Sequence, residues 1–333
     1  MSASYTSVGW NRAKKAYDTT IATGLVVYLL FFLGIGLAVH PEATIETLLI
    51  RALALAAFLM LHVILSIGPV CRMNPKYLPL LYNRRHLGVT MFLVALAHAV
   101  FAIVQFHALG NANPLVSLLT SGAGFQTFGA AALVLFFFMA ATSHDFWLAN
   151  LGPRFWKTLH MGVYFAYALI VVHVALGALH AEAHPVLAIA TGAGMAWLLA
   201  LHVVAAFRER AGDRDTRRAE DGWIDAGLVD SMEDGRARIV CAGERIAVFR
   251  YDGKLSAVSN VCRHQNGPLG EGRVIDGCIT CPWHGYQYLP GNGRSPAPFT
   301  EKVATYDVRV VGGRVYVTPQ AHEPGTNVEP AHA

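Results

Sequence analysis

Six long apolar runs dominate the first two thirds of this sequence and limit what the chain can fold into. They lie near residues 20–39, 48–69, 87–108, 124–143, 159–180 and 185–206. A helix needs about 20 apolar residues to cross the hydrocarbon core of a bilayer. The chain is 54% hydrophobic and only 14% charged, a balance typical of membrane proteins. We therefore predict an all-α six-helix bundle over residues 20–206, embedded in a lipid bilayer and preceded by a short segment at 1–19.

Basic residues are concentrated in alternate loops between these runs. They lie before the first run, between the second and third runs, between the fourth and fifth runs, and after the sixth run. In chain order these residues are Arg12, Lys14, Lys15, Arg72, Lys76, Arg84, Arg85, Arg154, Lys157, Arg208, Arg210, Arg214, Arg217 and Arg218. The opposite loops hold only Arg51, at a helix edge. Loops rich in Lys and Arg stay on the cytoplasmic side, so we expect both termini to be cytoplasmic.

After Trp223 the pattern changes to short runs rich in β-branched residues, such as 238–241, 246–249 and 308–311, separated by glycine-containing turns. Such runs predict strands. We predict a small all-β domain over 222–320, joined by a charged linker at 207–221 and followed by a disordered tail at 321–333. Residues 221–320 carry eleven basic and eleven acidic side chains. A near-neutral domain has no basic face for nucleic acid.

Two Cys-His pairs lie inside this β domain, Cys262-Arg263-His264 and Cys281-Pro282-Trp283-His284. Their spacing is typical of a Rieske-type [2Fe–2S] centre, in which two thiolates bind one iron and two imidazoles bind the other. We therefore expect Cys262, His264, Cys281 and His284 to be the metal ligands. A zinc site made from the same four ligands is the alternative, although the Cys-x-His spacing is unusual for a zinc ribbon.

The stretch from Cys281 to Tyr286 resembles the Rieske domains of soluble ferredoxins and ring-hydroxylating oxygenases. The resemblance implies that a loop at 296–298 shields the cluster and that Tyr288 donates a hydrogen bond to it. Rieske proteins of high potential have Ser where this chain has Tyr286, so we expect a lower potential. In cytochrome bc Rieske proteins a disulfide joins the two cluster loops. This chain lacks the cysteines that would form it, which fits a reducing compartment.

Histidines inside the apolar runs are a second candidate site, because an ionisable group inside a membrane is costly and usually functional. The third run begins with His86 and carries His98 deeper in, while the fifth carries His160 and His173. At about 1.5 Å rise per residue each pair is separated by roughly 18–20 Å. Both helices run outward, so His86 matches His160 in depth and His98 matches His173. This arrangement suits two stacked b-type haems.

The membrane half resembles the ferric-reductase-like transmembrane domain, and within it the haem-bearing membrane subunits of bacterial periplasmic methionine sulfoxide reductases. The motifs that carry the resemblance are Arg84-Arg85-His86-Leu87-Gly88, Leu96-Ala97-His98, Thr142-Ser143, Trp156-Lys157-Thr158-Leu159-His160, Tyr164 and His173. It implies a bacterial inner membrane, haem b bound by His98 and His173, and His160 at a second site. Related proteins have the inner histidine of the third helix where this chain has Arg84, so His86 as a ligand, and one haem or two, stay open.

The remaining histidines have simpler interpretations. His62 and His202 are expected to be hydrogen-bonded interior residues or to line a quinone site. His40, His107, His180 and His184 are expected near the outer face.

Together these features predict electron transfer between a cytoplasmic Rieske cluster and membrane haem b. The sequence contains no recognisable flavin or nicotinamide segment, and a one-electron centre cannot take hydride directly. The chain would therefore need a cytosolic electron donor or acceptor protein, and a periplasmic redox partner or quinone. The alternatives are a transmembrane ferric or cupric reductase and a quinol-linked oxidoreductase. A Rieske oxygenase is excluded because the sequence has no 2-His-1-carboxylate iron site.

Overall fold

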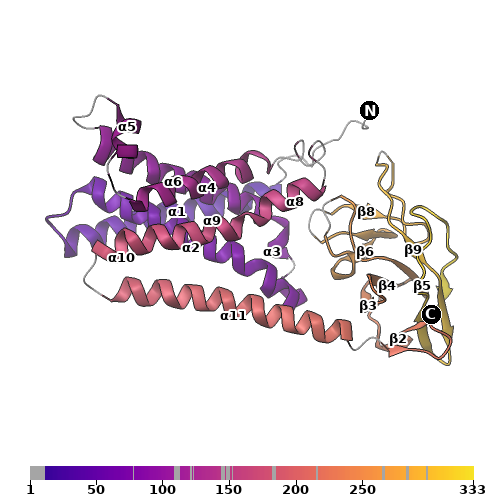
Figure 1. The fold of residues 1–333 in the computed structure, drawn as a ribbon. Helices are drawn as coiled ribbons and strands as arrows, with labels where there is room; N and C mark the ends of the chain where they lie inside the picture. The colour runs from indigo at the N-terminus through magenta and orange to yellow at the C-terminus, as the bar shows by residue number, and fades with distance from the viewer. Residues whose placement is uncertain are drawn as a thin grey trace. The chain divides into compact units, whose positions relative to one another are not determined.

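We describe a computed structural model of the protein, which places residues 12–77, 79–108, 113–120, 122, 124–143, 147, 151, 153–181, 185–214, 217–264, 267–282, 285–297 and 299–333. The described chain divides into two compact units. One comprises residues 12–69 and 83–201, and the other comprises residues 70–82 and 202–333. The first unit is helical, and the second contains all the strands (Figure 1).

Six helical segments in the structure are long and apolar enough to cross a membrane, as the sequence predicts. They are Lys14–Val39, Ile45–Met73, Arg84–Ala108, Gly124–Ala141, Phe155–Ala181 and Val186–Ala211. Figure 1 shows the long helices running alongside one another. The protein is therefore a multi-pass membrane protein.

The helices that form these segments differ in regularity. Their bounds are α1 Arg12–Val39, α2 Ile45–Met73, α4 Arg84–Ile103, α5 Pro114–Thr120, α6 Gly124–Ala141, α8 Pro153–Met161, α9 Val163–Leu176, α10 Ala178–Ala181 and α11 Val186–Arg214. The short elements η1 (Pro75–Tyr77) and α3 (Pro79–Tyr82) follow α2. The last turns of the third segment form a π-helix, η2 (Val104–Ala108). Helix α11 continues to Arg214, beyond the apolar run that we expect to end near 206.

The core of the helical unit is built from α2, α4, α6, α9 and α11. Its buried side chains include Leu61, Phe92, Phe136, Ala166 and Leu198. Large apolar side chains on the outer faces are exposed, for example Phe31 and Leu199 at 68% each. In water such exposure would be unfavourable, whereas in lipid it matches the solvent. Helix α1 packs through Leu25, Tyr28 and Leu29 on a second buried cluster, which contains Leu53 and Val94. The Tyr28 hydroxyl donates to the Ala52 carbonyl at 3.1 Å.

The strands form three antiparallel sheets, which confirms the predicted all-β domain. Their bounds are β1 Arg217–Arg218, β2 Ile224–Leu228, β3 Ala237–Cys241, β4 Arg245–Tyr251, β5 Lys254–Ser259, β6 Arg273–Ile275, β7 Cys278–Thr280, β8 Gln287–Tyr288, β9 Thr305–Tyr306, β10 Val308–Val311, β11 Arg314–Val317 and β12 Ala331–His332. The sheet orders are β1-β2-β11-β10, β12-β5-β4-β3 with β9 also on β5, and β6-β7-β8. Short 3-10 turns, η3 (Val229–Ser231) and η4 (Leu269–Glu271), connect them.

The tail at 321–333 contains a β-strand, contrary to the predicted disorder. Residues Ala331 and His332 form β12, which pairs with Leu255 and Lys254 of β5. The backbone N–H of Ala333 also donates to the Gly253 carbonyl at 2.9 Å. A polar, proline-containing composition suggests disorder, but here an open strand edge provides the missing hydrogen-bond partners.

Gly272 lets the β6–β7 hairpin close immediately before Cys281. A Cβ at this position would collide with the Thr280 carbonyl oxygen and approach the Leu269 carbonyl oxygen to 3.0 Å. Because both obstacles are backbone atoms, the hairpin would have to open. We expect Gly272→Ala to destabilise the β unit by about 2 kcal/mol or more. The cluster signal in visible circular dichroism should then disappear at a lower thermal midpoint than in the wild type. Gly291→Ala is the control, since its Cβ would meet the Val328 carbonyl oxygen at an ordinary 3.7 Å. Equal midpoints for the two variants would contradict this account.

Candidate metal and haem centres

Two tight loops present the predicted cluster cysteines. Cys262 follows β5, and its backbone N–H donates to the Gly267 carbonyl at 2.9 Å. Cys281 follows β7, where its N–H donates to the Tyr286 carbonyl at 2.8 Å and its carbonyl accepts the Gly285 N–H at 2.9 Å. Backbone hydrogen bonds thus fix the start of each loop, so the strands determine where both sulfur atoms lie.

The two sulfur atoms lie in the apolar interior of the β unit. Cys262 is 0% exposed and Cys281 is 2% exposed, and both pack in one cluster with Phe249 and Tyr288. None of the five cysteines, all within the described residues, is in a disulfide. Two buried thiols in two loops of one core are the donor set that an iron–sulfur centre requires on its thiolate side, so the residues fit the cluster.

Of the two predicted histidine ligands, the structure describes His264. The ring of His264 stacks on the ring of Tyr286, with centres 4.6 Å apart and planes at 11°. His284 lies outside the described residues, as do 265–266, 283 and 298. Within the placed part of the chain no three His, Cys, Asp or Glu side chains come together as a metal site, so the structure does not gather Cys262, His264 and Cys281 into one metal-binding group.

Two tyrosines beside the cluster loops use their hydroxyls differently. Tyr288 accepts the Arg263 backbone N–H at 3.0 Å, and its own O–H lies 3.4 Å from the Cys262 sulfur. Burial and the neighbouring Cys262 sulfur raise the pKa of Tyr288, so the phenol keeps the proton that it donates. Tyr286 instead donates to the Glu301 carboxylate, and burial together with this bond raises its pKa. Only Tyr288 therefore serves as the predicted hydroxyl donor to a cluster sulfur.

His98 of α4 and His173 of α9 come together in the helical unit. Their ring centres are 6.4 Å apart, with planes at 78°. A metal–imidazole bond is about 2.0 Å, and a ring centre lies about 1.2 Å beyond the bonded nitrogen. Two imidazoles on opposite sides of one iron would thus have centres roughly 6.4 Å apart. The observed spacing fits a haem iron between the two rings.

The hydrogen bonds of these two rings leave the same nitrogen available on each. His98 Nδ1 lies 3.0 Å from the Ile50 carbonyl, and His173 Nδ1 lies 2.8 Å from the Phe125 carbonyl. A ligating histidine commonly donates its other N–H to a carbonyl, which fixes its tautomer and orientation. Nε2 of each ring therefore remains for the metal. Sequence reasoning could not find these carbonyls, because a backbone acceptor has no residue-type signal.

Gly129 of α6 makes room for His173. A Cβ at this position would lie 2.7 Å from His173 Nδ1 and 2.8 Å from Cε1. A larger residue would therefore displace the ring from the Phe125 carbonyl. An isolated glycine in a helix has little sequence signal by itself, so the role of Gly129 could not be predicted.

The inner histidines are not assembled in the same way. His86 Nδ1 forms an ion pair with Asp18 of α1, at 2.8 Å from Oδ1. His160 stacks on Trp156 with ring centres 3.8 Å apart, and its Nδ1 lies 3.0 Å from the Trp156 carbonyl. His160 Nε2 is buried without a hydrogen-bond partner. Among the placed residues no ring contact joins His86 to His160.

Two other described histidines in this unit, His62 and His107, have polar partners. His62 lies between the Phe58 carbonyl, 2.8 Å from Nδ1, and the Tyr167 hydroxyl, 3.1 Å from Nε2. His107 is buried in the π-helix with Nδ1 3.0 Å from the Ser117 hydroxyl. These contacts agree with the interpretation of His62 as a hydrogen-bonded interior residue.

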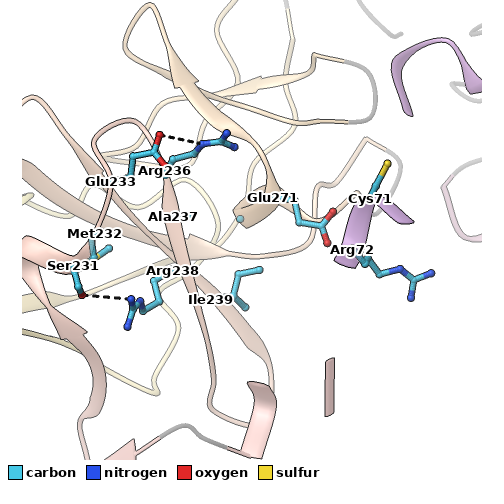
Figure 2. A pocket seen from close by; sticks show the side chains of 11 residues that line it. Cys71, Arg72, Ser231, Met232, Glu233, Arg236, Ala237, Arg238, Ile239 and Glu271 are labelled. Atoms are coloured by element: carbon cyan, nitrogen blue, oxygen red, sulfur yellow. Dashed lines mark hydrogen bonds and ion pairs between the residues drawn. The ribbon is translucent and has the colours of Figure 1, made fainter. Parts of the chain in front are cut away.

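The second unit contains one further polar pocket, of about 430 Å³, shown in Figure 2. Arg236 lies 3.9 Å from Glu233, and Arg238 donates to the Ser231 hydroxyl at 3.4 Å. Glu271 also lines this pocket, on the side where Arg72 lies. Burial raises the pKa of Glu271 to about 7, a shift that Arg72 opposes and Glu209 reinforces. None of the predicted cluster ligands lines the pocket.

The pKa of Glu271 predicts a pH-dependent stability. Because its value in the folded protein lies above the ordinary 4.5, its contribution is fully present below pH 4.5 and is lost as the pH rises through 7. We expect Glu271→Gln to reduce the fall in thermal midpoint between pH 5 and pH 8. Glu323→Gln, at an exposed carboxylate, is the control. An unchanged pH profile in Glu271→Gln would refute the assignment.

The six apolar helical segments and the two buried thiols of the β unit are what a membrane protein with an iron–sulfur domain would have. Residues 222–307 match the family described as "Rieske [2Fe-2S] domain", and residues 51–171 match the "Ferric reductase like transmembrane component". The chain belongs to the Rieske [2Fe-2S] domain family through its C-terminal part, which follows a ferric-reductase-like membrane domain. The expected resemblances to the Rieske domain and to the ferric-reductase-like transmembrane domain are thereby confirmed, as is the [2Fe–2S] cofactor.

Relatives of known name match the Rieske part. The anthranilate 1,2-dioxygenase ferredoxin subunit of Burkholderia cepacia is 39% identical over 97 residues, which cover 28% of this chain and 90% of that protein. The 3-phenylpropionate/cinnamic acid dioxygenase ferredoxin subunit of Photorhabdus laumondii is 36% identical over 92 residues, or 27% and 88% of the two chains. A solved complex of reduced oxygenase and oxidized ferredoxin in carbazole 1,9a-dioxygenase has 27% identity, covers 30% of this chain and 96% of that chain, and has a TM-score of 0.29.

Tyr288→Phe tests the hydroxyl donor to the Cys262 sulfur. Without this bond the reduced, more negative cluster loses stabilisation, so the potential should fall. A hydrogen bond of about 1 kcal/mol corresponds to about 40 mV for a one-electron couple. A redox titration followed by electron paramagnetic resonance measures the shift. A potential that stays the same or rises would contradict the geometry.

Proposed function

We propose that this protein carries electrons across the bacterial inner membrane between a cytoplasmic Rieske cluster and haem b in its helical unit. The spacing of His98 and His173 inside a six-span bundle is the observation that carries the proposal. A Rieske cluster and a b-type haem, when bound, each accept and release one electron. A chain with both groups could thus link a redox partner on one side of the membrane to one on the other.

The residues of the chain supply the two binding sites and their surroundings. Cys262, His264, Cys281 and His284 would hold the cluster, with Tyr288 donating to a sulfur. His98 and His173 would hold the haem through Nε2, while carbonyls of α2 and α6 orient the rings. The loops rich in Arg and Lys favour a cytoplasmic location for both termini, and hence for the cluster.

A second haem would depend on the expected inner histidines, His86 and His160. The buried Nε2 of His160 is a nitrogen that a metal could use. His86 is held by Asp18 through Nδ1, which likewise leaves Nε2 of this ring for a metal. We therefore propose His160 and His86 as the candidate histidines of a second, inner site, and the number of haems per chain decides whether that site is filled.

The relatives support a relay rather than substrate chemistry at the cluster. Two of them are named as ferredoxin subunits. By analogy we infer that the Rieske unit exchanges electrons with a cytosolic donor or acceptor protein. A periplasmic redox partner or quinone would complete the path at the other side. A transmembrane ferric or cupric reductase is the alternative, and it predicts reduction of a metal chelate without a partner.

Intramolecular electron transfer in the purified full-length protein tests the proposal. The cluster is reduced by a flash-generated one-electron donor, and the haem absorbance is followed by time. We expect haem reduction to follow cluster reduction in the wild type and to be lost in Cys262→Ser. Cys241→Ser, which changes a cysteine outside the predicted ligand set, is the control. Protein without b-type absorbance, or a cluster that never reduces the haem, would refute the function. Partner-free reduction of ferric chelate would favour the reductase.

The haem ligands can be tested separately. We expect His98→Ala or His173→Ala to remove the haem held by this pair while leaving the cluster signal intact, because the two sites lie in different units. Pyridine haemochrome analysis and an iron count measure this. His180→Ala, an exposed histidine of α10, is the control. Full haem content in His173→Ala would show the ligand assignment to be wrong.

A further inference from the structure

We propose that Tyr286 and Glu301 are positioning residues for the cluster ligand His264, and that residues 321–333, which we call the strap, hold Glu301 in place. The inference rests on the proposed assignment of His264 as a ligand. It concerns residues that the metal motif does not contain. It arises from a continuous set of contacts that runs from the strap to the imidazole.

The first contact is between Tyr286 and His264. Their rings are nearly parallel, at 11° with centres 4.6 Å apart. Tyr286 is itself buried, with Phe299 at 5.1 Å and Tyr288 at 5.4 Å between ring centres. A packed aromatic ring has few alternative positions. The face of Tyr286 therefore limits how the His264 ring can tilt.

The second contact is between Tyr286 and Glu301. The phenol donates to the Glu301 carboxylate, which also accepts the Thr300 backbone N–H at 3.1 Å. The Glu301 carbonyl accepts the Ser295 N–H at 3.0 Å. Hydrogen bonds to a charged acceptor are stronger than neutral ones. Glu301 thus fixes the tip of the ring whose face lies against His264.

The third set of contacts joins the loop at 291–303, which carries Glu301, to the strap. The Val328 N–H donates to the Gly291 carbonyl at 2.7 Å. Arg294 Nε donates to the Gly325 carbonyl at 2.8 Å. Gly291 and Arg294, which both lie in the first part of this loop, are therefore bonded to the strap.

The strap is anchored on both sides of these bonds. At one end the His322 N–H donates to the Thr305 carbonyl at 2.9 Å, and the Thr305 hydroxyl donates to the Thr326 carbonyl at 3.1 Å. At the other end Ala331 and His332 pair with β5. Since β5 leads directly into the Cys262 loop, the strap connects that strand to the loop carrying Glu301.

Four variants of the full chain test this inference: Tyr286→Phe, Glu301→Gln, the double variant, and a chain ending at Gln320. Tyr286→Phe keeps the ring and removes only the hydroxyl. The readouts are the electron paramagnetic resonance spectrum of the reduced cluster and the rate of cluster loss to an iron chelator. We expect shifted g values and about fivefold faster loss in each single variant, which is the factor for one hydrogen bond. The double variant should be no worse than the more affected single variant, because both changes act on the same hydrogen bond: one removes its donor and the other removes the charge of its acceptor.

Tyr251→Phe is the matched control, because it removes a phenol hydroxyl that is bonded to the Ser256 hydroxyl at 2.9 Å in the same unit. It should behave as wild type. The shortened chain should change both readouts in the same direction as Glu301→Gln. If it fails to load a cluster, Arg294→Gln, which removes one bond to the strap, decides the same question.

The inference is overturned if Tyr286→Phe leaves the spectrum and cluster loss unchanged, or if the two single effects add. A wild-type result for both the shortened chain and Arg294→Gln overturns the part that concerns the strap. These readouts need no haem. A wild-type cluster that is stable but fails to reduce the haem would therefore count against the proposed function and leave this inference standing.

Discussion

The helical unit depends on the need to pair imidazole nitrogens where water cannot reach them. A buried polar group without a partner costs free energy, and carbonyls inside a helix are already engaged. The structure meets this need by letting carbonyls of α2 and α6 accept a second hydrogen bond, from His98 and His173. A backbone carbonyl has two lone pairs and can accept a second hydrogen bond. The same bonds orient each ring, so the pairing that satisfies Nδ1 also leaves Nε2 available on both histidines.

The β unit meets a different need, which is to bury two thiols at fixed points on loops. Short strands carry the loops, and backbone hydrogen bonds close them at Cys262 and Cys281. The surrounding core is aromatic, with Tyr286 and Tyr288 both buried. Their hydroxyls have different acceptors, a sulfur for Tyr288 and a carboxylate for Tyr286. The surroundings of the predicted cluster ligands therefore include Tyr286, Tyr288 and the loop at 291–303.

Much of this organisation could be predicted from sequence because it depends on local patterns. The apolar length of a membrane helix and the spacing of two Cys-His pairs are visible without knowledge of the fold. The shared depth of His98 and His173 follows from helical rise alone. Contacts between distant segments were not visible. Asp18 could not be identified as the partner of His86, nor Glu301 as the partner of Tyr286, because ion pairs and hydrogen bonds between distant residues leave no periodic signal. The strand β12 was missed for the same reason, since its stability comes from β5 rather than from its own composition.

The covalent continuity of the chain, in which the last membrane helix and the iron–sulfur domain belong to one polypeptide, has a kinetic consequence. An electron carrier that is a separate protein must diffuse to its partner, and its encounters depend on concentration and ionic strength. A tethered carrier experiences a high effective concentration at its partner whatever the abundance of the protein. Exchange between the two halves would follow first-order kinetics, insensitive to dilution, so only the entry and exit of electrons would respond to the supply of soluble partners.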